Sequence, residues 1–170
     1  MVPFWLWVVL ALVGLQRVLE LLYARKAAKR LSAAGARWIP EDGYGLIVAV
    51  HVLLFVGCVA EGLWAPWPQA GWWTFAGGFL YALGAALRYT SMAALKERWS
   101  TRVYTLPGAP LVASGPYRYV RHPIYLGVFL ELLGIPLLGG FWLTLLVLTM
   151  LHIVALRRRI RIEERALGLD

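Results

Sequence analysis

The sequence predicts an all-α, polytopic integral membrane protein with five transmembrane helices, and three observations support this fold class. Hydrophobic residues make up 61% of the 170 residues and charged residues only 15%, whereas a soluble domain of this size is about a quarter charged. Five apolar stretches are separated by four connections, and basic residues gather in alternate connections. The composition excludes or disfavours a disordered chain, a secreted disulfide scaffold and, despite a net charge of +8, a nucleic-acid-binding module.

The five apolar stretches are the predicted helices. A bilayer core about 30 Å thick requires about 20 helical residues, so the first three stretches are long enough to span it alone. The last two are shorter and are separated by Gly139-Gly140, which predicts a tight helical hairpin. The arms of this hairpin either cross only part of the bilayer or depend on Pro136 and neighbouring helices to make up the missing length. The stretches are Val2–Tyr23, Tyr44–Trp64, Gly71–Leu95, Ile124–Leu138 and Phe141–Leu156.

The positions of Lys and Arg predict the orientation. The connections 24–43 and 96–123 and the tail 157–170 carry five basic residues each, whereas the connection 65–70 and the hairpin turn carry none. The positive-inside rule then places the N-terminus outside and the C-terminus in the cytoplasm.

The predicted topology implies one membrane-embedded domain over residues 1–170. Residues 1–95 supply three helices, and residues 96–170 supply a cofactor-binding loop, the helical hairpin and a tail. The first stretch has no basic segment before it and is too long for a signal peptide, so we expect it to remain in the mature protein.

Four charged residues are expected at membrane depth, where such side chains usually face protein or a water-filled cavity. Arg17 and Glu20 are three residues apart and are expected to pair. Arg88 and Glu131 are expected at similar depth, which predicts a buried ion pair, and both are candidate substrate-binding residues. No set of residues has metal-ligand spacing. Three further polar residues admit a structural or a functional role: His51, Glu61 and His152.

The densest polar stretch is the segment 114–127 on the basic side. Gly115-Pro116 is typical of a turn, and Pro123 suits the first turn of a helix, so the fourth helix is predicted to begin there. His122 then lies beside free backbone N–H groups that favour an anionic ligand group, and Gly127 allows a backbone or a flat ligand to approach closely. An ordinary basic membrane–water boundary is the alternative interpretation.

The tail carries a second polar pattern. If the fifth helix continues out of the membrane, Arg159 and Glu163 are i,i+4 neighbours on one face, although a charged helix leaving a bilayer is common. The hairpin brings the start of the fourth helix and the end of the fifth together. His122, Tyr125, Arg159 and Glu163 are therefore expected to border one pocket at the inner surface.

Two motifs in the C-terminal part of the chain carry a family resemblance. Residues 121–127 read R-H-P-I-Y-L-G after G-P-Y at 115–117, and R-x-x-x-E-E follows at 159–164. Over about 105–168 the chain resembles the isoprenylcysteine carboxyl methyltransferase family, whose members are integral-membrane enzymes that use S-adenosylmethionine.

The N-terminal half is similar to a bacterial branch of that family. It carries R-V-L-E-L at 17–21, A-V-H at 49–51 and Glu61. That branch is often associated with methylation of alkylpyrone or phenolic lipids. Prenylcysteine enzymes usually continue well beyond the Glu-Glu pair, whereas this chain stops at Asp170, which favours the lipid-modifying branch.

The resemblance implies a cofactor site and an acceptor site. It implies S-adenosylmethionine as the cofactor and S-adenosylhomocysteine as the product. It places Arg159 on the acceptor side, and Arg159 and Glu163 are the candidate catalytic residues. Together with Gly127, the expected cofactor-binding residues are Leu111, Val112, Tyr117, His122, Pro123, Ile124, Tyr125 and Glu163.

The expected function is methyl transfer to a carboxyl or acidic hydroxyl group of a lipophilic acceptor that enters from the surrounding membrane lipids. The active site is expected on the cytoplasmic side of a bacterial inner membrane, without a metal or a nucleic-acid partner. Two alternatives remain. One is a small membrane binding or transport protein with Glu20, His51, Arg88 and Glu131 along a polar path, and the other is a non-catalytic scaffold with a basic inner face.

Overall fold

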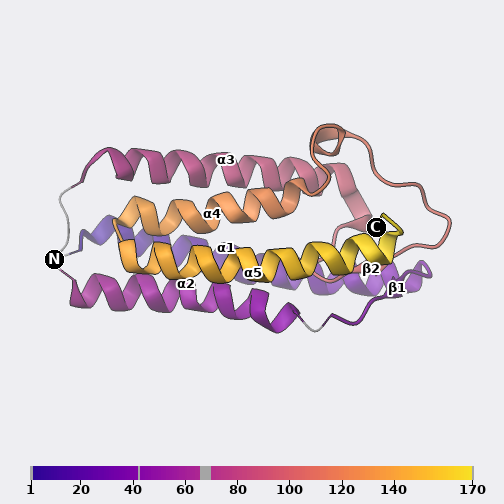
Figure 1. Cartoon of the computed structure of the whole chain (residues 1–170), viewed down its shortest axis with the longest axis horizontal. Helices are drawn as coiled ribbons and strands as arrows, with labels where there is room; N and C mark the ends of the chain where they lie inside the picture. Colours follow the sequence, from indigo (N-terminus) through magenta and orange to yellow (C-terminus); the bar gives the residue numbers. More distant parts are fainter. Residues whose placement is uncertain (1, 42, 66–69, 170) are drawn as a thin grey trace.

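A computed structural model describes residues 2–41, 43–65 and 70–169 and shows a mostly helical protein. Its helices run along the long axis of the molecule (Figure 1). The N-terminus and the α4–α5 turn lie at one end, and the C-terminus lies with two short strands at the other. The α-helices of the described residues are α1 (Phe4–Ala33), α2 (Tyr44–Trp64), α3 (Trp72–Leu95), α4 (Pro123–Gly139) and α5 (Trp142–Leu167).

Two short strands join the first connection to the third. β1 (Arg37–Trp38) pairs antiparallel with β2 (Tyr104–Thr105), so that segments far apart in the sequence meet at the end that carries the C-terminus. The third connection also contains two 3-10 helices, η1 (Lys96–Arg98) and η2 (Gly115–Arg118).

The hairpin and the start of α4 agree with the prediction. α4 begins at Pro123, whose missing N–H is harmless in the first turn. Gly140 ends α4 in a left-handed conformation, with φ of 64°, and donates to the Leu137 carbonyl at 3.0 Å. A side chain is disfavoured at this φ, so the predicted turn at Gly139-Gly140 depends on glycine.

Two helices are longer than predicted. α1 continues to Ala33 rather than ending at Tyr23, and α5 continues to Leu167 rather than ending at Leu156. Ala, Leu, Lys, Arg and Glu predominate in these extensions, and such residues favour helix without an apolar environment. The extension of α5 places Arg159 and Glu163 one turn apart on a single helix, as expected if the helix continues.

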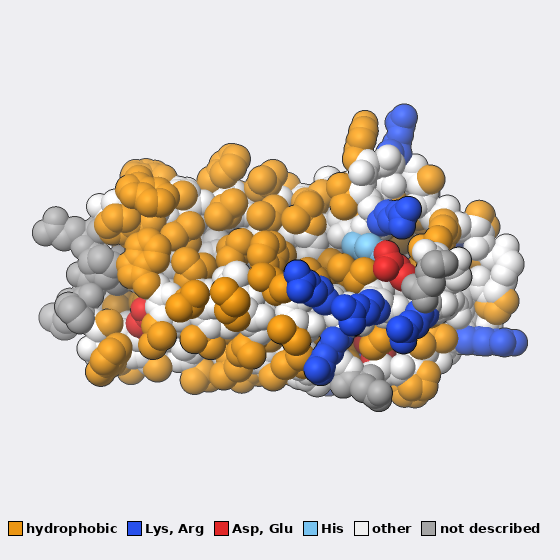
Figure 2. Space-filling model, in the orientation of Figure 1, with side chains coloured by type: hydrophobic (Ala, Val, Ile, Leu, Met, Phe, Trp, Pro, Cys, Tyr) orange, Lys and Arg blue, Asp and Glu red, His pale blue; other side chains and the backbone are white. Residues whose placement is uncertain are grey.

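The exterior of the helices is strongly apolar. Among the described residues, α1 and α2 are long and apolar enough to cross a membrane, and α4 is a shorter apolar helix. α3 has 24 residues but does not meet that criterion, since its glycines, its tyrosines and Arg88 lower its mean hydropathy. Large hydrophobic side chains are exposed along the helices, among them Leu12 (60% exposed) and Phe75 (80% exposed), and hydrophobic side chains cover most of the face in Figure 2. A soluble monomer rarely exposes so large an apolar surface.

The backbones of α3 and α4 are in direct contact. A Cβ atom added at Gly77 would lie 2.7 Å from the Gly134 carbonyl oxygen, and one added at Gly84 would lie 2.6 Å from that of Gly127. No larger residue fits at these positions without moving a helix. The four glycines therefore fix the separation of the two helices and the height at which α4 carries its polar residues.

A hydrophobic core packs the hairpin against the first two helices. Its buried side chains come from α1, α2, α4 and α5 and include Leu10, Leu54, Ile135 and Leu148. α4 is thus held on one side by α3 and on another by this core, which fixes both arms of the hairpin.

Replacing Gly77 by Ala should lower the free energy of unfolding by about 2 kcal/mol, because the new methyl group overlaps the α4 backbone. The neighbouring Gly78→Ala is the matched control, since a Cβ at Gly78 meets only the Leu138 side chain at an ordinary 3.6 Å. That control should be neutral or stabilising by up to about 1 kcal/mol. Equilibrium unfolding in detergent micelles measures both, and equal effects would contradict the backbone contact.

Candidate functional site

The start of α4 and the last turns of α5 lie together in the half of the molecule that carries the C-terminus (Figure 1). His122 Nε2 lies 3.1 Å from the Glu164 carboxylate, and the His122 ring stacks on Tyr125 with 5.6 Å between centroids. Tyr125 Oη donates to the Glu163 carboxylate. The grouping of His122, Tyr125, Arg159 and Glu163 expected from the sequence is therefore present.

Arg159 is the centre of this group and is buried, with 6% of its surface exposed. Its Nε donates to Tyr125 Oη at 2.9 Å, and one terminal nitrogen donates to the Thr101 carbonyl at 2.8 Å. The other terminal nitrogen forms an ion pair with Glu41. All three nitrogens of the guanidinium thus contact protein oxygens.

Sequence reasoning missed Glu41 and Thr101. Glu41 follows β1, its side chain is 0% exposed, and it accepts a hydrogen bond from Val103 N at 2.9 Å. No local pattern marks such a residue, because it meets Arg159 only in the folded protein. The β1–β2 pair joins the first connection to the third, and both connections then contact Arg159 of α5. The adjacent acids Glu41 and Asp42 in an otherwise basic connection were the one signal available in the sequence.

Of the expected cofactor-binding residues, His122, Pro123, Ile124 and Tyr125 lie at the start of α4, whereas Leu111 and Val112 lie in the connection before η2. Leu111 is exposed, Val112 and Ile124 are half-buried, and Pro123 is buried. The His122 side chain does not cap the first turn of α4, and within the described part of the chain no acceptor meets the backbone N–H groups of Ile124 and Tyr125, which are therefore open donors.

Tyr117 and Gly127 occupy different surroundings. Burial, together with the nearby Glu163 carboxylate, raises the pKa of the Tyr117 hydroxyl above its ordinary value. Tyr117 therefore stays protonated and is a hydrogen-bond donor at neutral pH. Gly127 faces α3, where an added Cβ would lie 2.8 Å from the Gly84 carbonyl oxygen. Helix packing accounts for this glycine.

Arg17, Glu20, Arg88 and Glu131 form one ring of ion pairs between α1, α3 and α4. Glu131 contacts Arg88 at 3.0 Å and Arg17 at 2.5 Å, and Glu20 contacts Arg88 at 2.6 Å and Arg17 at 3.1 Å. Arg88 is 2% exposed and Glu131 1% exposed. Both predicted pairs are confirmed, and together they hold two charges of each sign, so the buried charges compensate one another.

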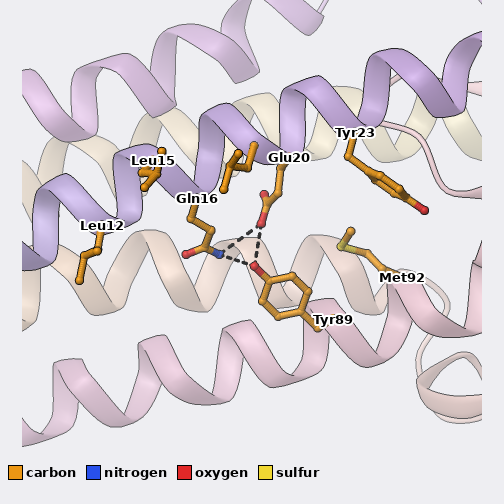
Figure 3. Close-up of a pocket in the computed structure, with 8 residues that line it drawn as sticks. Leu12, Leu15, Gln16, Glu20, Tyr23, Tyr89 and Met92 are labelled. Atoms are coloured by element: carbon orange, nitrogen blue, oxygen red, sulfur yellow. Dashed lines mark hydrogen bonds between the residues drawn. The ribbon is translucent and has the colours of Figure 1, made fainter.

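A groove of about 390 Å³ lies between α1 and α3, beside the ion-pair ring (Figure 3). Its polar side chains are bonded to one another: Gln16 Nε2 donates to Tyr89 Oη at 2.8 Å and to Glu20 at 3.2 Å, and Tyr89 Oη lies 3.0 Å from Glu20. The rest of the wall is apolar. The groove is lined by Leu12, Leu15, Gln16, Leu19, Glu20, Tyr23, Tyr89 and Met92.

One short segment separates the groove from Arg159. Tyr23, in the groove wall, stacks on Trp99 with 5.4 Å between ring centroids. Trp99 is two residues before Thr101, whose carbonyl accepts from Arg159. Two residues of extended chain span at most about 7 Å. Residues 99–101 therefore connect the groove wall to the Arg159 group.

The three polar residues with open roles have structural surroundings. Glu61 accepts from Leu143 N at 3.1 Å and from Thr144 N at 2.8 Å, so it caps the start of α5 from α2. His51 bonds to the Ile47 carbonyl of its own helix, and His152 stacks on Phe129. Among the described residues, no group of three or more His, Cys, Asp or Glu side chains is arranged to hold a metal ion.

Comparison with known proteins identifies one family. A family model described as the isoprenylcysteine carboxyl methyltransferase (ICMT) family matches residues 78–168. The chain is 32% identical over 161 residues to the uncharacterized protein YpbQ of Bacillus subtilis, which covers 95% of each chain. It is 37% identical over 75 residues to an uncharacterized protein of Haemophilus influenzae, which covers 44% of each chain. No solved structure matches it significantly.

Replacing Glu131 by Gln should lower the free energy of unfolding by about 3 kcal/mol, because two buried guanidinium groups then share one carboxylate. Adding Arg17→Gln to this variant should recover much of the loss, since one Arg and one Glu remain in the ring. Equilibrium unfolding of the single and double variants in detergent micelles measures the coupling. If the losses in the free energy of unfolding of the two single variants simply added in the double variant, the charge-balanced ring would be contradicted.

Proposed function

The chain belongs to the isoprenylcysteine carboxyl methyltransferase family, and on that premise we propose that it is an S-adenosylmethionine-dependent methyltransferase of the membrane. Its acceptor is a carboxyl or acidic hydroxyl group on a lipophilic molecule of the alkylpyrone, phenolic-lipid or isoprenylcysteine type. The observation that carries the proposal is the grouping of His122, Tyr125, Arg159 and Glu163 at one end of the helices, inside the region that matches the family.

The proposed setting is a bacterial inner membrane crossed five times, with the N-terminus outside and the site at the cytoplasmic face. Two observations support this arrangement. The exterior of the helices is apolar, and the Lys and Arg side chains visible in Figure 2 gather towards the end of the molecule that carries the C-terminus. An uneven distribution of this kind is typical of membrane proteins with a basic inner side.

The residues at the start of α4 fit the cofactor. When bound, S-adenosylmethionine supplies a methyl group on a sulfonium, and it also carries a carboxylate and an amino group. The open N–H groups of Ile124 and Tyr125 suit a carboxylate at a helix N-terminus, while the Glu163 and Glu164 carboxylates suit the cationic groups. Tyr117 and His122 add a protonated hydroxyl and a flat ring. Leu111, Val112 and Pro123 are the proposed apolar contacts.

The groove between α1 and α3 is the proposed site for the hydrocarbon part of the acceptor. The leucines of its wall are exposed on the exterior of the helices, so a hydrocarbon chain enters sideways from the bilayer without crossing water. Residues 99–101 connect the groove wall to Arg159. Arg88 and Glu131 contribute to this site through the ion-pair ring. Arg88 pairs with Glu20 in the groove wall, and Glu131 in turn pairs with Arg88.

The chain's own residues then serve mainly to position the reactants. Methyl transfer is an in-line displacement, and holding two reactants in the reacting geometry while excluding water accounts for much of the acceleration. Arg159 can hold an anionic oxygen by charge-assisted hydrogen bonds. An acceptor that is already ionised requires no general base.

Incubation with methyl-labelled S-adenosylmethionine and a bacterial lipid extract tests the function. The purified protein should transfer label to a lipid, and mass spectrometry then identifies the product. Arg159→Ala should reduce transfer at least a hundredfold while it retains cofactor binding, because the acceptor's anionic group loses its partner. Undiminished turnover by this variant would remove Arg159 from the mechanism.

His122→Ala should weaken cofactor binding itself by about tenfold, since it removes the ring beside the open end of α4. Isothermal titration calorimetry with S-adenosylmethionine measures the affinity. His51→Ala is the matched control, because His51 bonds only to its own helix among the described residues, and it should retain wild-type affinity. An unaltered affinity in His122→Ala would reject the assignment of His122 to the cofactor.

A further inference from the structure

We propose that Glu41 occupies the position on Arg159 that the acceptor's anionic group takes, so that an acceptor binds only by displacing this built-in carboxylate. The inference rests on the proposed function, in which Arg159 lies on the acceptor side. It makes Glu41 a specificity-determining residue that selects ionised acceptors over neutral ones.

The guanidinium of Arg159 is saturated with protein partners. Tyr125, Thr101 and Glu41 contact its three nitrogens, and among these partners only Glu41 brings a full negative charge. A carboxylate is the partner that a guanidinium binds most strongly. An incoming carboxylate or enolate therefore competes directly with Glu41 for the same nitrogen.

The backbone of the third connection holds Glu41 in position. Its other carboxylate oxygen accepts from Val103 N at 2.9 Å, and Ile39 N donates to the Val103 carbonyl at 3.0 Å. The β1–β2 pair adjoins these bonds. Glu41 is thus positioned by the backbone of the third connection, which also carries Trp99 and Thr101 between the groove and Arg159.

A displaced Glu41 side chain has other cationic partners close to the connection between α1 and α2. Arg102 lies over the Tyr44 ring with its guanidinium carbon 3.4 Å from the centroid. Arg158 is exposed, and its Cβ would be 3.9 Å from a Cβ atom at Gly43. The carboxylate can therefore leave Arg159 for a basic, water-accessible surface instead of remaining buried and unpaired.

The pairing of Glu41 with Arg159 determines which class of acceptor can bind. A neutral alcohol cannot displace a carboxylate from a buried guanidinium, because it offers no charge to replace the lost pair. An amphiphile with an ionised head group can displace the Glu41 carboxylate, because it brings a negative charge of its own. The acceptor is therefore a long-chain carboxylate or an acidic enol in its ionised form. Its arrival also breaks the Glu41 contact that helps to hold the segment between the groove and Arg159.

The test compares binding of radiolabelled dodecanoate and dodecanol to the full chain in nanodiscs of zwitterionic phospholipid. Glu41→Gln should bind dodecanoate at least tenfold more tightly than the wild type, because Arg159 loses its competing charge, while dodecanol binding stays unchanged. Glu97→Gln is the matched control, since Glu97 is exposed on the same basic side in η1. It should bind both probes as the wild type does.

Glu41→Asp guards against a folding defect, because it keeps the charge but shortens the reach to Arg159. It should bind dodecanoate more tightly than the wild type and less tightly than Glu41→Gln. Equal or weaker dodecanoate binding in both variants would overturn the proposal. The assay needs no methyl transfer, so a wild type that fails to bind S-adenosylmethionine would refute the proposed function and leave this test intact.

Discussion

The backbone contact between α3 and α4 is the constraint on which the rest of the structure depends. At Gly77, Gly84, Gly127 and Gly134 the two helices touch without side chains between them, which sets the height of α4 relative to α3. That height aligns Glu131 with Arg88 and places His122 at the end of the molecule. Because α4 turns back into α5 at Gly140, the same contact also determines where Arg159 and Glu163 lie.

Charge compensation is the second principle of the fold. The ion-pair ring keeps two arginines and two glutamates neutral as a group among apolar helices. The Arg159 group differs, because it lies near the basic end, where water and other cations are close. The ring is thus suited to a permanent structural role. The contact between Arg159 and Glu41 is suited to exchange for another anion.

Much of the fold could be predicted because its signals are local. Apolar length gave the helices, Pro123 gave the start of α4, and Gly139-Gly140 gave the hairpin. The joining of two ion pairs into one ring could not be predicted, since it depends on the rotation of three helices about their axes. Glu41 was missed for a related reason: two-residue strands bring its connection to α5, and pairing this short leaves no periodic pattern in the sequence.

We propose that the start of α4 and the end of α5 together form the S-adenosylmethionine site. Amide hydrogen exchange of the purified wild-type protein, measured with and without saturating S-adenosylmethionine, tests it most directly. Saturable protection should be concentrated in peptides that cover residues 114–127 and 157–165. No saturable protection, or protection confined to the α1–α2 half of the chain, would contradict it.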